Sequence, residues 1–367
     1  LSMHPLADTI AAQAEALRSQ GAQVIVVAAH AGGDCKHFDD STDISSCSPE
    51  QEIMLVANQL PTKAVDVIVA GHTHRGMAHQ INGIAIIESY SYGAAFGRVD
   101  LLIAPTGETS LQTIHPPRSL CLDKKDKRPD CDAGSYEGKP VQADEELAAL
   151  AKVAAGFAAK IRSKPLGIEL TGPVLRSRSD ASALGNLFVD LMLAAQPKAD
   201  VAINNGGSLR ASLPQGNLLY GDLFEAMPFD NRFALVTLRG QTLKKLIASN
   251  LRADRGILSI AGMRAKASCK QGDLAVTLTR KNGKRVRDQE RILLATSDFV
   301  ASGGDGLLGS EGMVIDSTKI DGGPLIRDAM ATLIETNASA ISKSIPTLLD
   351  ANKPRIQFSG TRPLTCK

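Results

Sequence analysis

Residues 24–30 read VIVVAAH, and residues 65–74 read VDVIVAGHTH. Each apolar run is typical of a strand buried on both faces, and the runs end at His30 and at His72 and His74. In α/β folds, the carboxyl ends of strands line the crevice where ligands bind. Histidines two positions apart in an extended segment project to the same side, and neutral imidazole is the commonest metal ligand. The three histidines together predict a metal site, although His30 alone would be interpreted as a surface residue.

Helical patterns flank these strands. Residues 6–19 have apolar side chains at helical spacing, and Gly21 ends that helix. A second helix is predicted from Ser48, as N-cap, through Pro49 in the first turn to about Leu60. The alternation of strands and helices predicts a layered α/β domain. The other four histidines lie in polar or loop contexts and are expected at the surface: His4, His37, His79 and His115.

The rest of the chain suggests a second domain. Residues 84–88 and 97–103 predict further strands, and the Pro-, Lys-, Asp- and Gly-rich residues 105–142 predict a loop. The alanine-rich residues 144–163 predict a helix that joins two domains, after which an α/β pattern returns. The predicted organisation is a first domain at 1–142, a linker helix at 143–164 and a second domain at 165–367.

Length and composition exclude several classes of protein. A chain of 367 residues is long for one core, and 43% hydrophobic residues fit a globular protein. The net charge is +2, and the nearest basic run, residues 124–128, is typical of a solvated loop, so no nucleic-acid polymer is expected as partner. No apolar stretch approaches the roughly 20 residues of a membrane helix. Residues 1–5 do not resemble a signal peptide and read like the middle of a protein.

The six cysteines are even in number and two pairs are close in sequence. Each local pair brackets a polar, turn-rich loop that a disulfide could close, which indicates an oxidising compartment. Zinc ligands would more often show C-x-x-C spacing, and six reduced thiols in a cytosolic protein remain the alternative. The predicted pairs, the last by elimination, are Cys35 with Cys47, Cys121 with Cys131, and Cys269 with Cys366. A periplasmic, cell-surface or secreted location is expected.

Three polar motifs mark the second domain. Residues 204–210 read NNGGSLR, where glycines let the backbone approach a ligand and Asn205 and Arg210 offer polar recognition. The alternative is a plain turn with a surface arginine. Phe229 and Phe299 stand in polar, glycine-rich turns of a chain with only 4% aromatic residues. Two facing rings could sandwich a flat base, each stacking contact being worth about 1–3 kcal/mol, while core packing is the alternative for either ring alone. Asp305 could accept hydrogen bonds from ribose hydroxyls.

The two histidine motifs resemble the last two metal motifs of calcineurin-like metallophosphoesterases. The resemblance implies two divalent ions (Zn, Mn, Mg or Ca), with His30 and His72 on one and His74 on the other. The family's earlier Asp-x-His, Gly-Asp and Asn-His-Glu/Asp motifs are missing, and the family places them, with the general-acid histidine and its acidic partner, upstream of residue 1. Three histidines cannot supply a bridging carboxylate and roughly four ligands per ion. An N-terminal segment of the same protein is therefore expected to complete the site.

The motifs Asn-Gly-Gly-x-x-Arg, Pro-Phe-x-Asn and Phe-x-x-x-Gly-Gly-Asp-Gly resemble the C-terminal domain of 5′-nucleotidases. The resemblance implies that Phe229 and Phe299 stack on the base, that Asp305 holds the ribose, and that Asn205 faces the base. Asn231 belongs to the same binding set. Phosphate would be met by Arg210 and Arg178, with Arg176 as the alternative to Arg178. Leu307 stands where the family often has an aromatic residue.

Together these features predict the fold class: a partial four-layer metallophosphoesterase α/β domain and a separate α/β (α+β) nucleotide-binding domain, joined by a helix. The implied function is hydrolysis of nucleotide phosphate esters at a dinuclear metal site, as in 5′-nucleotidases. UDP-sugar, cyclic-nucleotide or thiosulfate-type hydrolysis are alternatives on the same scaffold, and the phenylalanine pair favours a substrate with a nucleoside group. A non-catalytic nucleotide-binding module is the alternative if the missing ligands are truly absent, and this chain alone is expected to be inactive.

Overall fold

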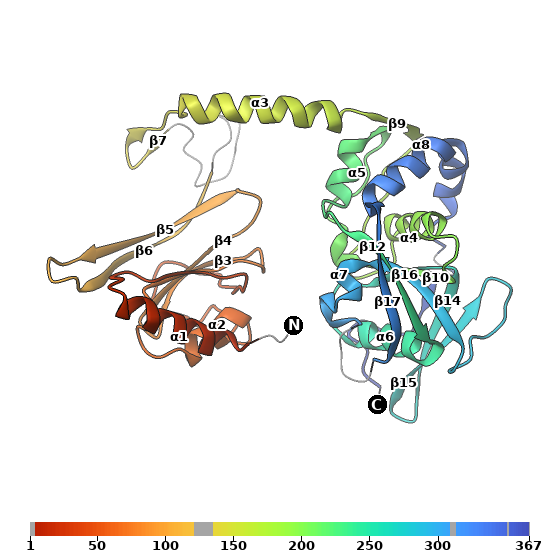
Figure 1. The fold of residues 1–367 in the computed structure, drawn as a ribbon, viewed down its shortest axis with the longest axis horizontal. Helices are drawn as coiled ribbons and strands as arrows, with labels where there is room; N and C mark the ends of the chain where they lie inside the picture. The colour runs from red at the N-terminus through yellow and green to blue at the C-terminus, as the bar shows by residue number, and fades with distance from the viewer. Residues whose placement is uncertain (1–3, 121–134, 309–312, 351, 367) are drawn as a thin grey trace. The chain divides into compact units, whose positions relative to one another are not determined.

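The structure is a computed structural model that describes residues 4–120, 135–308, 313–350 and 352–366 (Figure 1). The chain divides into two compact units, residues 1–144 and 145–367. Each unit has its own sheets and its own hydrophobic core, and both mix helices with strands. The predicted α/β class is therefore confirmed for both parts of the chain.

The first unit is built on a four-stranded sheet in the order β1-β2-β4-β3. Its strands are β1 (Val26–Ala28), β2 (Val67–Val69), β3 (Gly76–Ile81) and β4 (Ile84–Ser89). The first three in spatial order are parallel, and β3 is antiparallel to β4. The remaining elements of this unit are α1 (Leu6–Ser19), α2 (Glu52–Gln59), β5 (Ala95–Ile103), β6 (Thr109–Ser119), β7 (Ser135–Tyr136) and β8 (Lys139–Pro140).

The two faces of this sheet are covered by different elements. Side chains alternate across a strand, so Ile84 and Ile86 enter the core beneath α1 and α2, while Ala85 and Ile87 face the β5–β6 hairpin. Figure 1 shows the two helices on one side of β3 and β4 and the hairpin on the other. This packing fixes the sheet whose strand ends carry the histidine motifs.

Several predicted elements of the first unit need correction. The helix at 6–19 is confirmed, but α2 begins at Glu52 with Gln51 as N-cap, so the prediction of Ser48 as N-cap is wrong. The strand before His30 is not buried on both faces, because β1 lies at the sheet edge and Val26 is 58% exposed.

The segment predicted as loop at 105–142 is also wrong in part, because it contains the 11-residue strand β6. Strand β3 was not predicted at all, although the Asn82-Gly83 pair at its end is a hairpin signal. Both residues have positive φ, 52° and 78°, as two-residue hairpin turns require.

The second unit is built on a five-stranded sheet in the order β13-β10-β16-β12-β17. Its strands are β10 (Val201–Asn205), β12 (Arg232–Arg239), β13 (Leu258–Ala261), β16 (Arg291–Ser297) and β17 (Ile315–Leu325). Strands β10 and β16 are parallel, and the other neighbouring pairs are antiparallel. One face packs against α4 (Ala183–Ala195) and α8 (Ile326–Ser344), and the other against α6 (Gly240–Arg252).

Smaller elements complete the second unit. They are α5 (Tyr220–Ala226), α7 (Asp298–Ala301), β9 (Pro165–Leu170), β11 (Gly216–Leu219), β14 (Met263–Lys270), β15 (Asp273–Arg280), β18 (Ile356–Gln357), and the 3₁₀ turns η1 (Gly206–Ser208), η2 (Gly304–Gly306) and η3 (Ile345–Thr347). The helix expected at 144–163 is present as α3 (Glu145–Arg162), and none of its residues is buried.

Two of the three predicted disulfides are present, Cys35–Cys47 and Cys269–Cys366. Cys121 and Cys131 lie outside the described residues. Among the helices that the structure describes, none combines the length and apolar character needed to cross a membrane.

Candidate functional site

The first candidate site is the pair His30 and His72, at the ends of the segments that follow β1 and β2. Parallel pairing of Val27 with Ile68 brings these two strand ends to the same edge of the sheet. His30 Nε2 and His72 Nδ1 lie 3.0 Å apart, and both side chains are exposed. Two imidazole nitrogens on one tetrahedral zinc, each at about 2.0–2.1 Å, would be separated by roughly 3.3 Å. The two nitrogens are thus at hydrogen-bond distance, and the same separation is compatible with a shared divalent ion.

His74 lies apart from this pair. Its ring packs edge-on against Tyr92 at 5.5 Å, and among the described residues it forms no three-ligand cluster with His30 and His72. His72 and His74 both have left-handed φ, 85° and 59°. Such backbone is uncommon for residues other than glycine, and its strain is often stored at functional sites. His74 thus lies outside the pair formed by His30 and His72.

The loops that carry these histidines are held very close together. A Cβ at Gly32 would lie 2.3 Å from the Gly71 carbonyl oxygen, so only glycine fits. Across this contact the Thr73 hydroxyl lies 2.6 Å from the Gly33 carbonyl oxygen. The Glu88 carboxylate bridges both loops, 2.7 Å from the Thr73 hydroxyl and 2.9 Å from the Gly33 amide nitrogen that donates to it.

Glu88 was not identified from the sequence. It ends the apolar run of β4 and is 1% exposed. A carboxylate placed within such a run is a signal that it meets hydrogen-bond donors, because buried polar groups are almost always paired. Its partners are the two loops of the candidate metal site, so Glu88 supports that site from beneath.

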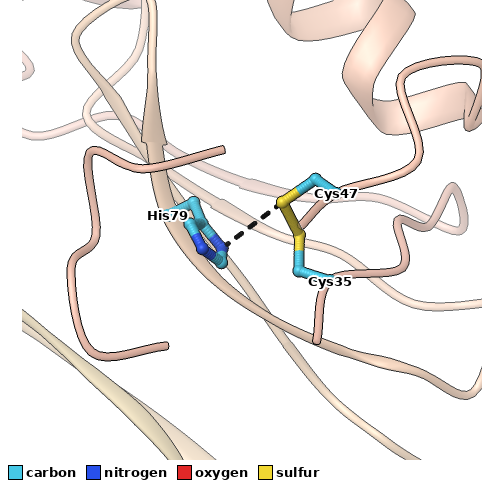
Figure 2. A group of neighbouring side chains, drawn as sticks. All are labelled: Cys35, Cys47 and His79. Atoms are coloured by element: carbon cyan, nitrogen blue, oxygen red, sulfur yellow. Dashed lines mark hydrogen bonds between the residues drawn. A yellow bond between two sulfur atoms is a disulfide. The ribbon is translucent and has the colours of Figure 1, made fainter. Parts of the chain in front are cut away.

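A second group of potential metal ligands is already occupied by a covalent bond. Figure 2 shows the Cys35–Cys47 disulfide beside the ring of His79, with Cys47 Sγ 3.8 Å from Nδ1. The sulfur atoms of a disulfide are not thiolates, which are the metal-binding form of cysteine. The expectation that His79 is a surface residue is wrong: it is 0% exposed. His4 and His37 are exposed as expected, and His115 is half-buried against Asp100.

In the second unit, strand register brings the three polar motifs to one edge of the sheet. Ala202 pairs with Ala295 in parallel, so β10 and β16 end together. Phe233 pairs with Ser297, so β12 begins where β16 ends. The motifs at 204–210, 227–231 and 298–306 therefore all leave or enter the sheet at this edge.

Direct contacts join two of these motifs. Asn205 Nδ2 donates to Asp305 Oδ2 at 2.7 Å, while its buried Oδ1 has no partner among the described residues. Asp305 is exposed and has a positive φ of 55°. A polar pair with one free buried acceptor and one exposed carboxylate is suited to bind a ligand that carries hydroxyl or amino groups.

The two phenylalanines keep much of their surface exposed: 37% at Phe229 and 44% at Phe299. The Arg210 guanidinium lies 5.2 Å from the centre of the Phe229 ring. The Phe299 ring packs flat against Gly304, where a Cβ would come within 2.5 Å of it. Since large aromatic side chains usually gain by burial, these exposed rings offer stacking surfaces.

The remaining predicted residues have differing surroundings. Arg176 donates to the Leu209 carbonyl at 2.9 Å and so braces the Gly-Gly turn, whereas the side chain of Arg178 is exposed. The backbone carbonyl of Asn231 accepts from Ile326 N at 2.9 Å. Leu307 is 1% exposed and belongs to the core, so it does not replace an aromatic residue at a pocket edge.

Comparison with known proteins finds a family for part of this chain. Residues 159–310 match the family model of the 5′-nucleotidase C-terminal domain. Endonuclease YhcR of Bacillus subtilis strain 168 is 26% identical over 293 residues, covering 79% of this chain and 22% of that protein. Protein UshA of Yersinia enterocolitica is 24% identical over 316 residues, covering 79% of this chain and 55% of that protein. The chain thus spans less than two thirds of the length of these relatives.

The fold comparison extends over both units. The 5′-nucleotidase precursor of Thermus thermophilus is 19% identical with a TM-score of 0.57, covering 91% of this chain and 65% of that one. The fold shared with that structure is an α/β unit followed by a second unit, and the sequence of residues 159–310 is that of a nucleotidase C-terminal domain. The similarity to 5′-nucleotidases thus rests on the family model over residues 159–310 and on relatives such as protein UshA.

Proposed function

We propose that this chain recognises a nucleotide through its second unit and takes part in metal-dependent hydrolysis of the phosphate ester through its first. The observation that carries the proposal is the convergence of three motifs on one sheet edge, with Asn205 bonded to Asp305 and Arg210 over Phe229. The membership of residues 159–310 in the nucleotidase C-terminal domain supports it.

In this proposal the nucleoside half of the substrate is held by stacking and by hydroxyl recognition. Phe229 and Phe299 offer exposed ring faces, and each base stack contributes about 1–3 kcal/mol. Asp305 accepts from the ribose hydroxyls, Asn205 contacts the base, and Asn231 belongs to the same binding set. The exposed rings favour a substrate with a nucleoside group, including UDP-sugars and cyclic nucleotides, over a thiosulfate-type substrate.

Phosphate is met by cations and by the candidate metal site. Arg210 and Arg178 provide guanidinium groups, which pair with phosphate oxygens through two parallel hydrogen bonds. His30 and His72 would hold one divalent ion and His74 a second. Such ions, when bound, supply Lewis-acid stabilisation of the reacting phosphoryl group. Three imidazoles do not fill two coordination spheres, so the proposed site includes ligands from a further segment of the protein.

We also propose that the protein works in an oxidising compartment, at the cell surface, in a periplasm or outside the cell. Two disulfides support this location, because such bonds persist where thiols are not kept reduced.

Nucleoside binding tests the proposal without requiring hydrolysis. Titration calorimetry with adenosine, uridine and AMP should detect binding, and F229A, F299A and D305N should each weaken it about tenfold or more. F157A is the matched control, because Phe157 is an exposed phenylalanine of the same unit, 66% exposed on α3. If F157A weakens binding as much as F229A does, the proposed nucleoside site is wrong.

Measuring phosphate release distinguishes a hydrolytic enzyme from a non-catalytic nucleotide-binding module. AMP with manganese or zinc should yield phosphate from the protein that contains all its metal ligands. Binding without release under those conditions would favour a non-catalytic nucleotide-binding module, because the second unit alone carries the nucleoside contacts.

A further inference from the structure

The first turn of α8 holds the loop that carries Phe229. Arg327 is the second residue of this helix and is 4% exposed, although it carries a permanent charge. A buried guanidinium is stable only where its donors are paired, so its partners show what it does. They all belong to α5 or to the loop between α5 and β12.

Three of the four hydrogen bonds of Arg327 go to this loop. Nη1 donates to the carbonyl oxygens of Met227 and Phe229, both at 3.1 Å, and Nη2 donates to the Asp230 carboxylate at 2.8 Å. The neighbouring amide of Ile326 donates to the Asn231 carbonyl at 2.9 Å. Two consecutive residues of α8 thus bind three backbone carbonyls within a five-residue loop.

The other contacts of Arg327 keep the guanidinium itself in place. Nε donates to the Tyr220 hydroxyl at 3.1 Å, and the guanidinium carbon lies 4.6 Å from the centre of the Phe224 ring. Both partners are on α5, so the arginine is fixed from one side by a helix and presents its remaining donors to the loop. A planar fork fixed in this way imposes its geometry on the groups that it binds.

Met227, at the start of the loop, is packed in the core, whereas the three residues that follow it are less buried. Pro228 lacks an N–H donor, and Phe229 and Asp230 are exposed. The ring of Phe229 is nevertheless the surface on which we propose that the base stacks. Fixing that ring before the ligand arrives lowers the entropic cost of binding.

We infer that Arg327 is a positioning residue for nucleobase binding, which acts by holding the backbone on either side of Phe229 rather than by touching the nucleotide. The inference rests on the proposed function. The substitution R327K tests the inference, because lysine keeps the positive charge but lacks the planar fork of donors.

The test is a double-mutant cycle on nucleoside affinity, measured by titration calorimetry with adenosine on the full chain. R327K should raise Kd about tenfold, and F229A should raise it by at least as much. In the F229A background, R327K should cause no further loss, because residues that act through one another are not additive.

R355K is the matched control. Arg355 is also largely buried in the second unit and binds Asp190 with both terminal nitrogens, at 2.7 and 2.6 Å, far along the chain from the Phe229 loop. It should lower the unfolding temperature without changing Kd. A second variant, Y220F, removes one acceptor of Arg327 but leaves the loop intact. It should raise Kd two- to threefold, and it replaces R327K in the test if R327K does not fold.

Each outcome of these affinity measurements supports or overturns the role of Arg327. An unchanged Kd in R327K or, if that variant is unfolded, in Y220F overturns the inference, as does an equal loss from R327K with and without Phe229. An equal loss in R355K would show that the effect is general destabilisation. If F229A itself binds adenosine as tightly as the native protein, the proposed nucleoside site is wrong, and the inference falls with it.

Discussion

The Glu88 carboxylate lies 2.7 Å from the Thr73 hydroxyl, and its other oxygen accepts from the amide that follows Gly32. One buried side chain therefore joins the loop after His30 to the loop that contains His72 and His74. The histidines themselves are exposed, and this bridge adds to the hydrogen bond from Gly71 N to the Ala31 carbonyl oxygen, 3.2 Å, in holding their loops together.

E88A should weaken metal binding about tenfold, because side chains that support metal ligands typically account for 10–100-fold in affinity. It also leaves the buried Gly33 amide without its acceptor, at a cost of about 1–3 kcal/mol in the free energy of unfolding. Titration calorimetry with zinc or manganese and urea unfolding measure the two effects.

E88Q is the matched control. Its amide oxygen can accept from Gly33 N, and its amide nitrogen can donate to the Thr73 hydroxyl, which in turn donates to the Gly33 carbonyl oxygen 2.6 Å away. All three hydrogen bonds survive, so E88Q should bind metal nearly as well as the native protein. A loss in E88Q equal to that in E88A would show that the charge, not the geometry, matters.

Gly304 and Phe299 allow a test of the second stacking surface. G304A would place a methyl group within 2.5 Å of the ring, and it should displace Phe299 and raise the Kd for adenosine several-fold. G156A is the control: nothing lies within 4 Å of that position on α3, and alanine should stabilise the helix by up to about 1 kcal/mol. Equal affinities of the two variants would contradict a role for Phe299 in stacking.

The histidine motifs and the three motifs of the second unit could be found from the sequence because each follows an apolar run or stands in a glycine-rich turn. Their convergence depends on strand register, such as Phe233 opposite Ser297. Register is set by pairing between distant segments and cannot be deduced from either segment alone. Supporting residues such as Glu88 and Arg327 could not be found, because their partners are distant in the sequence.

His79 shows a different kind of failure. In β3, Met77, His79 and Ile81 alternate on one face, and all three are buried. Period-two alternation predicts this, but His79 was placed in a polar or loop context and interpreted as a surface residue. The missing element was the strand itself, which was not predicted from the sequence.

His79 should make stability depend on pH. Burial lowers its pKa, and the opposing influence of the His37 backbone and of the carboxylates of Asp43 and Asp40 does not offset this. The unfolded chain therefore binds more protons than the folded one, and stability should fall as pH decreases below about 6.5. Urea unfolding at pH 7.5 and pH 5 measures the change.

H79L should remove this part of the pH dependence. It removes the buried Nε2, which has no hydrogen-bond partner among the described residues, but also Nδ1, which accepts from Ala78 N at 3.3 Å, so stability at pH 7.5 should change by no more than about 1 kcal/mol. H37L controls for loss of an exposed histidine. If H79L keeps the full pH dependence of the native protein, burial of His79 is not its source.

The two disulfides should stabilise different units by different amounts. Cys35–Cys47 spans 12 residues of the first unit, and Cys269–Cys366 spans 97 residues of the second. In the chain-entropy model, closing loops of these lengths contributes about 3 and about 4.7 kcal/mol. C35S/C47S should therefore lower the calorimetric transition of the first unit, and C269S/C366S should lower that of the second unit by more.

Native protein treated with dithiothreitol should lose both contributions together. If each double variant moved both transitions equally, the two units would not be independently folded, and the division of the chain at residue 144 would have no thermodynamic counterpart.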